Sequence, residues 1–190
     1  MPTIIYRGSK QELTRLLQSL PAILAGRSSD PLGIARSVQL RAGVALLSQV
    51  QQDFLTKSRG GVGRDGIQWK PLTTKTIAAR RKPKGRRSGK GTPTSSVDIL
   101  RDTGELLRSL SPGVDDRPSG ADGQVFVTTP GRVIVGTNKK PWHQSGTRRI
   151  PARPMWPQDG RIPSAWWQAV QLAAMRGVIR AIALAVERKK

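Results

Sequence analysis

The sequence contains no cysteine and only one histidine. Without cysteine, the chain has no disulfide framework and no thiolate ligand for a metal ion. A catalytic triad or metal site built on the single histidine, His143, needs partners, and the nearest carboxylates along the chain are those of Asp122 and Asp159. We therefore expect His143 to be a structural residue in a loop, and we predict no metal or other cofactor.

Acidic residues are also scarce, at 12 against 33 lysines and arginines. Two pairs cluster in the sequence: Asp115 with Asp116, expected in a polar loop, and Asp102 with Glu105, expected at a helix start. A two-metal nuclease needs several carboxylates that converge on one site, which this distribution does not favour. The sequence also has no glycine-rich phosphate-binding loop. We therefore predict that the protein is not an enzyme.

Large apolar side chains are few. Hydrophobic residues make up 36% of the chain and aromatic residues 4%, alongside 20 glycines and 14 prolines. A chain of 190 residues is long enough for one domain with a sizeable core. This composition instead indicates a lean core, much irregular backbone and a fold completed by neighbouring molecules.

Positive charge is abundant, and the formal net charge is +21. Such an excess favours a polyanionic partner: a nucleic acid, an acidic protein surface or a membrane face. The charge is densest between Gly66 and Val97, where nine lysines or arginines occur without an acid. We predict a flexible basic loop over residues 80–97. The candidates for contact with a polyanion are Arg80, Arg81, Lys82, Lys84, Arg86, Arg87 and Lys90.

The basic loop has more than one interpretation. No aromatic residue lies between Trp69 and Phe126, so base stacking is not expected and any nucleic-acid contact would be made to phosphates. The favoured alternative is a solvated, flexible loop or an arm that becomes ordered against an acidic neighbour.

Two long helices are expected. Apolar residues recur at helical spacing from Ile34 to Lys57, and glycines from Gly60 onward end the pattern. A second helix is predicted from Ala165 to about Arg188, with Ser164 as its cap. Two arginines interrupt the second helix and oppose a membrane span. We expect it to pack against protein, with a position on a membrane surface as the minor alternative.

Shorter elements are expected between and before these helices. Ser9 and Glu12 form a capping-box pattern ahead of a short helix in an N-terminal extension over residues 1–33. Residues 73–81 are predicted as a brief helix. Residues 124–129 and 132–137 read as an antiparallel hairpin around Pro130-Gly131. Because Pro-Gly prefers a turn type that fits hairpin twist poorly, we expect a longer or bulged connection there.

The segment from Ile99 to Leu110 is predicted to form a short capped helix. Asp102 is the expected cap, and Glu105 can reach back to the helix start. Leu106, Leu107 and Leu110 then share one face. With the elements above, these predictions describe a single domain, 1–190. Its expected class is α+β: an antiparallel sheet packed with a long helix in the N-terminal half and a C-terminal helix, 163–188.

Five short motifs occur in an order that resembles one family. They are Trp69-x-Pro71-Leu72, Leu100-Arg101-Asp102-Thr103-Gly104-x-Leu106-x-x-Ser109, Val133-Ile134-Val135-Gly136, His143-Gln144-x-Gly146 and Ile150-Pro151-Ala152-Arg153-Pro154-Met155. Together they resemble the phage virion morphogenesis family, the tail completion or neck proteins of Mu-like tailed phages, over about residues 35–160. The N-terminal extension, the C-terminal helix and the long basic stretch depart from the family pattern.

The resemblance implies a structural virion protein. By family analogy, it would form a sixfold or twelvefold ring at the head–tail junction, after assembly in the host cytoplasm, with no membrane association. Its implied partners are a head-side connector or head completion protein and a tail terminator or tail tube protein, with genomic DNA passing through the ring. The alternative function, from the charge alone, is sequence-independent nucleic-acid binding in DNA packaging.

Ring assembly requires contacts between subunits. Arg153 lies between two prolines, and we expect it to project from a stiff segment toward a carboxylate of a neighbour or, alternatively, into solvent. The full set of candidates for contacts between subunits or rings is Asp102, Thr103, Gly104, Arg108, His143, Gln144 and Arg153.

Overall fold

A computed structural model describes residues 18–19, 21–22, 33–81, 98–99, 104–113, 118–129, 131–139, 142–148, 151–157 and 161–187. The elements are helices α2 (Ile34–Ser58), α3 (Thr74–Arg81), α4 (Glu105–Ser109), α5 (Trp142–Ser145) and α6 (Ser164–Glu187), with strands β1 (Gln124–Thr129) and β2 (Arg132–Thr137). The strands pair antiparallel. The predicted α+β class, with a long helix in the N-terminal half and a C-terminal helix, is confirmed.

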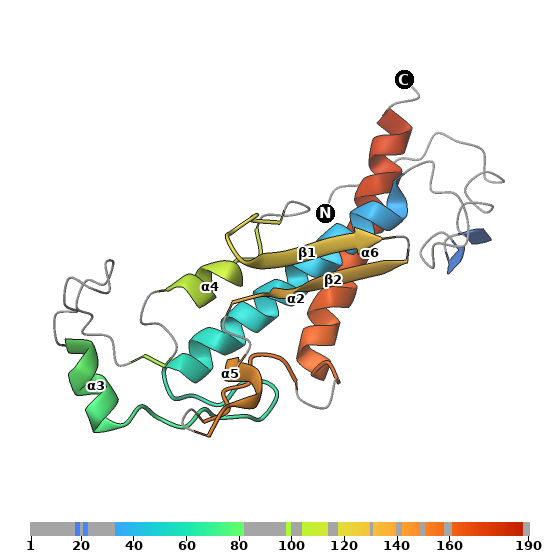
Figure 1. Ribbon diagram of the computed structural model, residues 1–190. Coiled ribbons are helices and arrows are strands. Elements are labelled where there is room, and N and C mark those ends of the chain that lie inside the picture. Colours follow the sequence, from blue (N-terminus) through green and yellow to red (C-terminus); the bar gives the residue numbers. More distant parts are fainter. Residues whose placement is uncertain are drawn as a thin grey trace.

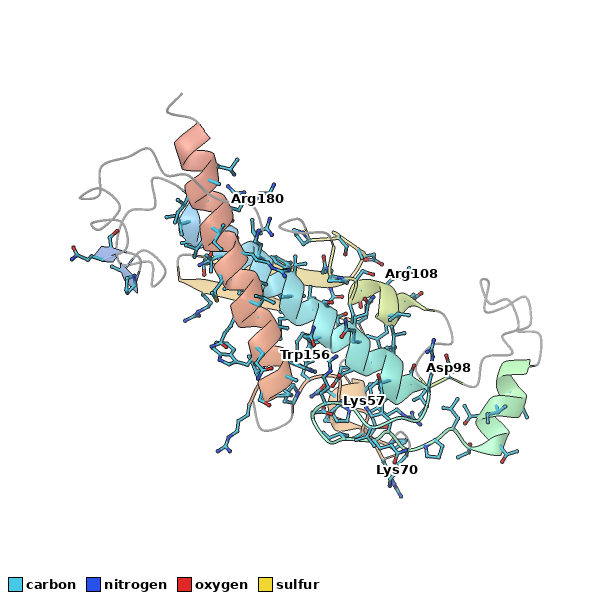
Figure 2. All side chains as sticks on the ribbon, turned by 180° about the vertical axis from the view of Figure 1, so that it is seen from behind. Lys57, Lys70, Asp98, Arg108, Trp156 and Arg180 are labelled. Atoms are coloured by element: carbon cyan, nitrogen blue, oxygen red, sulfur yellow. The ribbon has the colours of Figure 1, made fainter. Side chains whose placement is uncertain are left out.

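Helix α2 forms the middle of three layers. The hairpin crosses one side of α2 in Figure 1, and α6 crosses the opposite side, which faces the viewer in Figure 2. Both crossings depend on a glycine. A Cβ atom on Gly43 would lie 2.7 Å from the ring of Phe126, and one on Gly177 would lie 2.9 Å from the Cα atom of Val38. The missing side chains let the layers approach closely.

The ends of α2 are set by glycines in the left-handed conformation. Gly33 precedes the first turn with a φ of 65°. After the last turn, Gly60 has a φ of 86° and donates its N–H to the carbonyl of Lys57 at 3.0 Å. The predicted helix from Ile34 to Lys57 is therefore confirmed, with one more residue at its end. Its predicted stripe reaches the core through Leu47, Val50 and Phe54.

The hairpin connection is tighter than predicted. Thr129 pairs directly with Arg132, so Pro130-Gly131 forms a two-residue connection, and the expected longer or bulged connection is wrong. Gly131 has a φ of 71°, a left-handed conformation in which a tight hairpin turn is possible. Pro130 itself lies outside the described residues.

Helix α4 begins later than the capping-box pattern predicts. Its N-cap is Gly104, with a φ of 71° and no side-chain cap, so the prediction that Asp102 caps the helix is wrong. Asp102 lies outside the described residues, whereas Gly104 turns the chain into the helix through the left-handed conformation. The predicted apolar face is confirmed, because Leu106 and Leu110 are buried and Leu107 packs against the same core.

The main core collects side chains from distant parts of the chain. At its centre, Phe54 of α2 meets Trp69 edge to face, with ring centroids 5.3 Å apart. The remaining buried members are Val50, Ile99, Leu106, Leu110, Met155 and Trp166. One core therefore joins the end of α2, the loops that follow it, α4 and the start of α6.

The other helix predictions also have outcomes. The brief helix predicted over 73–81 is α3, which starts one residue later, and Thr73 Oγ1 accepts the backbone N–H of Thr76 at 3.3 Å. Helix α6 begins at Ser164, one residue before the predicted start, and Pro163 accepts the N–H of Trp167, so the prediction that Ser164 caps the helix is wrong. Among the described helices, none combines the length and apolar character needed to cross a membrane. The predicted Ser9–Glu12 capping box lies outside the described residues.

Candidate interaction surfaces

Two of the motifs meet at the carbonyl of Pro154. The indole N–H of Trp69 donates to this oxygen at 3.0 Å, and the ammonium of Lys57 lies 3.4 Å from it. Both donors are buried. A buried carbonyl with two such donors holds its segment firmly in place. The segment 151–155 is thereby fixed against the end of α2.

A second pair of motifs meets through Gln144 on α5. This short helix also contains His143, so the prediction that His143 lies in a loop is wrong. The side-chain amide of Gln144 donates to the carbonyl of Trp156 at 2.7 Å, and its oxygen accepts the backbone N–H groups of Met155 and Trp156 at 3.0 and 3.2 Å. Arg153 N–H donates to the carbonyl of His143 at 2.7 Å. The His-Gln motif is therefore a brace for the segment 151–156, and a contact between subunits through Gln144 stays a prediction.

The predicted projection of Arg153 is wrong. Its side chain is 7% exposed, and Nη2 donates to the carbonyl of Lys70 at 3.3 Å. The physical reason is that the stiff segment lies against the loop after α2, so that the arginine turns inward and its planar donors meet backbone oxygen. It therefore links the segment to residues near Trp69, and a role between subunits stays a prediction.

The other predicted contact residues lie apart from this cluster. Gly104 is the N-cap of α4, and Arg108 lies within α4 and is exposed. Figure 2 labels Arg108 beside this helix. Asp102 and Thr103 lie outside the described residues. Of the predicted polyanion contacts, Arg80 and Arg81 end α3, while Lys82, Lys84, Arg86, Arg87 and Lys90 lie outside the described residues.

A buried ion pair was not predicted. Lys57 Nζ lies 2.5 Å from Asp65 Oδ2, and the two side chains are 1% and 5% exposed. The ammonium also lies 5.9 Å from the ring centroid of Trp69, within reach of a cation–π interaction. Nearby, the buried carboxylate of Asp53 accepts the N–H of Arg64 at 2.8 Å. The signal for these buried carboxylates in the sequence is that Asp53 and Asp65 are two acids in a region otherwise rich in lysine and arginine.

The outer face of α6 carries a stripe of exposed apolar side chains. Leu172, Met175 and Ile179 are 51%, 62% and 49% exposed and follow helical spacing. Arg176 and Arg180, also exposed, lie on one flank of this stripe. Isolated exposed apolar residues are ordinary. Three in register on one helix form a surface suited to contact with another molecule.

The outer face of the hairpin is also apolar. Val127 and Ile134 are 46% and 47% exposed and are direct cross-strand partners. They point away from α2, because their neighbours Phe126 and Val133 are the residues that reach Gly43. The sequence pattern predicted the strands but did not distinguish a covered second face from an exposed one.

An exposed ion pair lies at the end of the hairpin where β1 begins and β2 finishes. Asp122, which is 91% exposed, pairs with Lys139 at 2.8 Å. The hydrogen bond from Lys139, followed by its charge, lowers the pKa of Asp122. The same hydrogen bond raises the pKa of Lys139.

A cavity of about 400 Å³ opens beside the start of α6. Its lining mixes guanidinium and apolar groups: Arg64, Asp65, Ile67, Pro157, Arg161, Ile162, Pro163 and Ser164. The carboxylate of Asp65 is already held by Lys57. Across the part of the chain that the structure describes, no three His, Cys, Asp or Glu side chains are grouped to hold a metal ion. The cavity is therefore a hollow of arginine and apolar groups in which the carboxylate of Asp65 is already paired.

Comparison of the chain with protein-family models, with curated proteins and with solved structures gives no match. The described geometry consists of a braced cluster of motifs and two apolar outer faces. The resemblance to the phage virion morphogenesis family stays a prediction from the motifs.

Proposed function

We propose that the protein is a non-enzymatic subunit of a ring at the head–tail junction of a tailed phage, a neck or tail completion protein. In this role it links a head-side connector or head completion protein to a tail terminator or tail tube protein. The ring leaves a passage for DNA. Such a function requires a rigid subunit with faces for neighbours, and it needs no active site.

The observation that carries this proposal is the pair of apolar outer faces on opposite layers. Val127 and Ile134 lie on the hairpin side of α2, whereas Leu172, Met175 and Ile179 lie on the α6 side. A subunit in a closed ring must present one face to each of two neighbours. The low content of large apolar residues supports the same proposal. Apolar surface that is buried between subunits adds to the stabilisation that the small core of a single subunit provides.

The braced cluster supplies the required rigidity. Gln144 and Trp69 hold the segment 151–156 through buried or half-buried hydrogen bonds. This segment leads directly toward α6, and Trp166 of α6 is buried in the same core. The orientation of α6 relative to α2 is thereby fixed at one end by the core and along its length by the Gly177 crossing.

A complementation experiment tests the proposal. In a phage that encodes the chain, a nonsense mutation in its gene is expected to yield DNA-filled heads and complete tails that do not join. Expression of the protein in trans is expected to restore joined particles. If heads and tails join normally without the protein, the proposed function is wrong.

The net charge of +21 favours a second candidate function, sequence-independent binding to DNA during packaging. This function predicts that the logarithm of the affinity for duplex DNA falls almost linearly with the logarithm of the salt concentration. Binding that stays tight at physiological salt, with normal joining of heads and tails in the mutant phage, would favour it over the ring. Negligible binding at that salt concentration would exclude it.

A further inference from the structure

The outer face of α6 cannot turn inward, because the opposite face of the helix is committed to α2. Gly177 sits directly on the backbone of Val38, and Ser37 Oγ donates to the carbonyl of Gly177 at 3.3 Å. A stripe of large apolar side chains on a helix is usually packed against another surface. The stripe of Leu172, Met175 and Ile179 is therefore a surface suited to packing against another molecule.

The chemistry of this face is apolar and cationic. Arg176 and Arg180 lie four residues apart along one flank of the stripe. In Figure 2, Arg180 lies on the part of α6 that is far from Lys57. No acidic residue occurs in α6 before Glu187. The complementary surface is one with an apolar patch next to carboxylates.

The hairpin of the same chain has these properties. Val127 and Ile134 form its apolar patch, and the exposed carboxylate of Asp122 lies at the end where β1 begins. Glu105 of α4 is exposed and close enough to this end for its charge to raise the pKa of Lys139. In a chain of net charge +21, this is a rare place where described carboxylates face solvent.

We propose that the outer face of α6 in one copy packs on the outer face of the hairpin in the next copy, with Arg176 and Arg180 directed toward Asp122. This inference rests on the proposed ring, for which it names the contact between subunits. The spans are comparable: the eight steps from Leu172 to Arg180 rise about 12 Å along α6, and the five steps from Gln124 to Thr129 extend about 17 Å along β1.

Charge favours this head-to-tail pairing over the pairing of two α6 faces. The charged groups of the α6 face are arginines alone, whereas the hairpin side offers both carboxylates and cations: Asp122, Glu105, Lys139 and Arg132. Two α6 faces in contact would bring Arg176 and Arg180 of one copy toward the same arginines of the other. Like charges at an interface oppose binding. A head-to-tail contact also leaves the hairpin face unused in one copy and the α6 face unused in the other, so that assembly continues until the ring closes.

A protein surface fits the α6 stripe better than a lipid surface. Gln168 lies in line with Leu172, Met175 and Ile179 and is exposed. In hydrocarbon its amide would lose its hydrogen bonds, which is costly, whereas a protein neighbour offers partners for it. The arginines also lie on one flank only, which suits a neighbour with its carboxylates on one side.

The absence of cysteine from the chain makes disulfide trapping a direct test. Leu172→Cys and Val127→Cys variants that carry tags of different size are mixed in equal amounts and oxidised. We expect the mixed 127–172 dimer to exceed, by about tenfold, the product from Leu172→Cys with Val62→Cys, a matched site that is 57% exposed. Equal yields, or a dominant 172–172 dimer, would overturn the inference.

Exchanged charges test the proposed ion pairs. In the trapping pair, Arg176→Glu on one copy or Asp122→Lys on the other is expected to lower the yield of mixed dimer about threefold to tenfold, and the two together to restore it. If the combination restores nothing, the proposed register is wrong. The face would be assigned to a lipid surface instead by two results together. The protein would bind phosphatidylglycerol vesicles and lose this binding with Met175→Glu, and the trapping experiment would give no 127–172 product.

Oxidation of assembled particles separates this inference from the proposed function. Particles built with both cysteines in every copy are expected to give ladders of linked subunits. Particles that contain the chain but yield no ladder would refute the α6–hairpin contact and leave the neck role standing. Particles that lack the chain would refute the neck role, while the 127–172 product of the purified variants would still decide the contact.

Discussion

The side chain of Gln144 bonds to the backbone of Trp156 in both directions: it donates to the carbonyl at 2.7 Å and accepts from the N–H at 3.2 Å. The amide thus pairs with this segment in the way that the backbone of a neighbouring strand would. Because the same oxygen also accepts from Met155, one side chain satisfies three backbone groups. This brace joins the His-Gln motif to the Ile-Pro-Ala-Arg-Pro motif, two pieces on which the family resemblance rests.

Replacement of Gln144 by alanine is expected to lower the free energy of unfolding by about 2–3 kcal/mol, because three half-buried backbone groups lose their partners. Urea denaturation monitored by tryptophan fluorescence measures the change. Gln168→Ala on the exposed face of α6 is the control and should stay within about 0.5 kcal/mol of the parent. Equal effects of the two substitutions would show that the brace adds no stability.

The buried ion pair gives a second prediction. Lys57→Met leaves the carboxylate of Asp65 buried without its counter-charge, so we expect a loss of about 3–5 kcal/mol in unfolding free energy. Asp65→Asn in the same chain should recover much of that loss, because the buried carboxylate that lost its counter-charge is then neutral. The exposed Lys70→Met variant is the control. A Lys57→Met protein as stable as this control would contradict the buried pair.

The crossing of α2 and α6 depends on the absence of a side chain at Gly177. An alanine there would bring its Cβ atom within 2.9 Å of the Cα atom of Val38, so we expect a loss of about 1–3 kcal/mol, although alanine favours helices. Thermal unfolding measures the loss. At Gly136, where the nearest atom to an added Cβ is 3.9 Å away, alanine should be nearly neutral. An unchanged melting temperature for Gly177→Ala would contradict the close crossing.

The exposed Asp122–Lys139 pair predicts a local pH dependence. Pairing with Lys139 lowers the pKa of Asp122 in the folded protein. The ion pair therefore contributes to the stability of the fold above pH 3.8, the unfolded pKa, and this contribution is lost as the pH falls through the folded pKa. Lys139→Met should move the pKa of Asp122 back up toward 3.8, as NMR titration of its carboxyl carbon can measure. Lys70→Met should leave it unchanged, and an unmoved pKa in Lys139→Met would disprove the pairing in solution.

The spacing of apolar residues along the sequence was sufficient to predict the two long helices, α2 and α6, and the α+β class of the fold. The pattern from Ile34 onward, with glycines beyond Lys57, locates α2 closely, because helix ends depend on local backbone conformation. The same local reasoning failed at Asp102, where a left-handed Gly104 sets the helix start instead. Capping boxes are favourable patterns, but a glycine in the right place competes with them.

The candidate surfaces were less accessible to sequence reasoning, because they depend on tertiary packing. Arg153 turns inward only because the loop around Lys70 lies beside it, 83 residues earlier in the chain. Likewise, the exposed stripe on α6 becomes evident only when its opposite face is assigned to α2. Apolar residues occur on both faces of α6, so the sequence gives no signal of which apolar face stays uncovered.

The most direct measurement of the central claim is cryo-electron microscopy of particles from a phage that encodes the chain, focused on the head–tail junction. The account predicts a ring of this chain there, with the outer face of α6 in each copy lying on the hairpin of the next copy and the arginines beside Asp122. A junction built without this chain would contradict the proposed function.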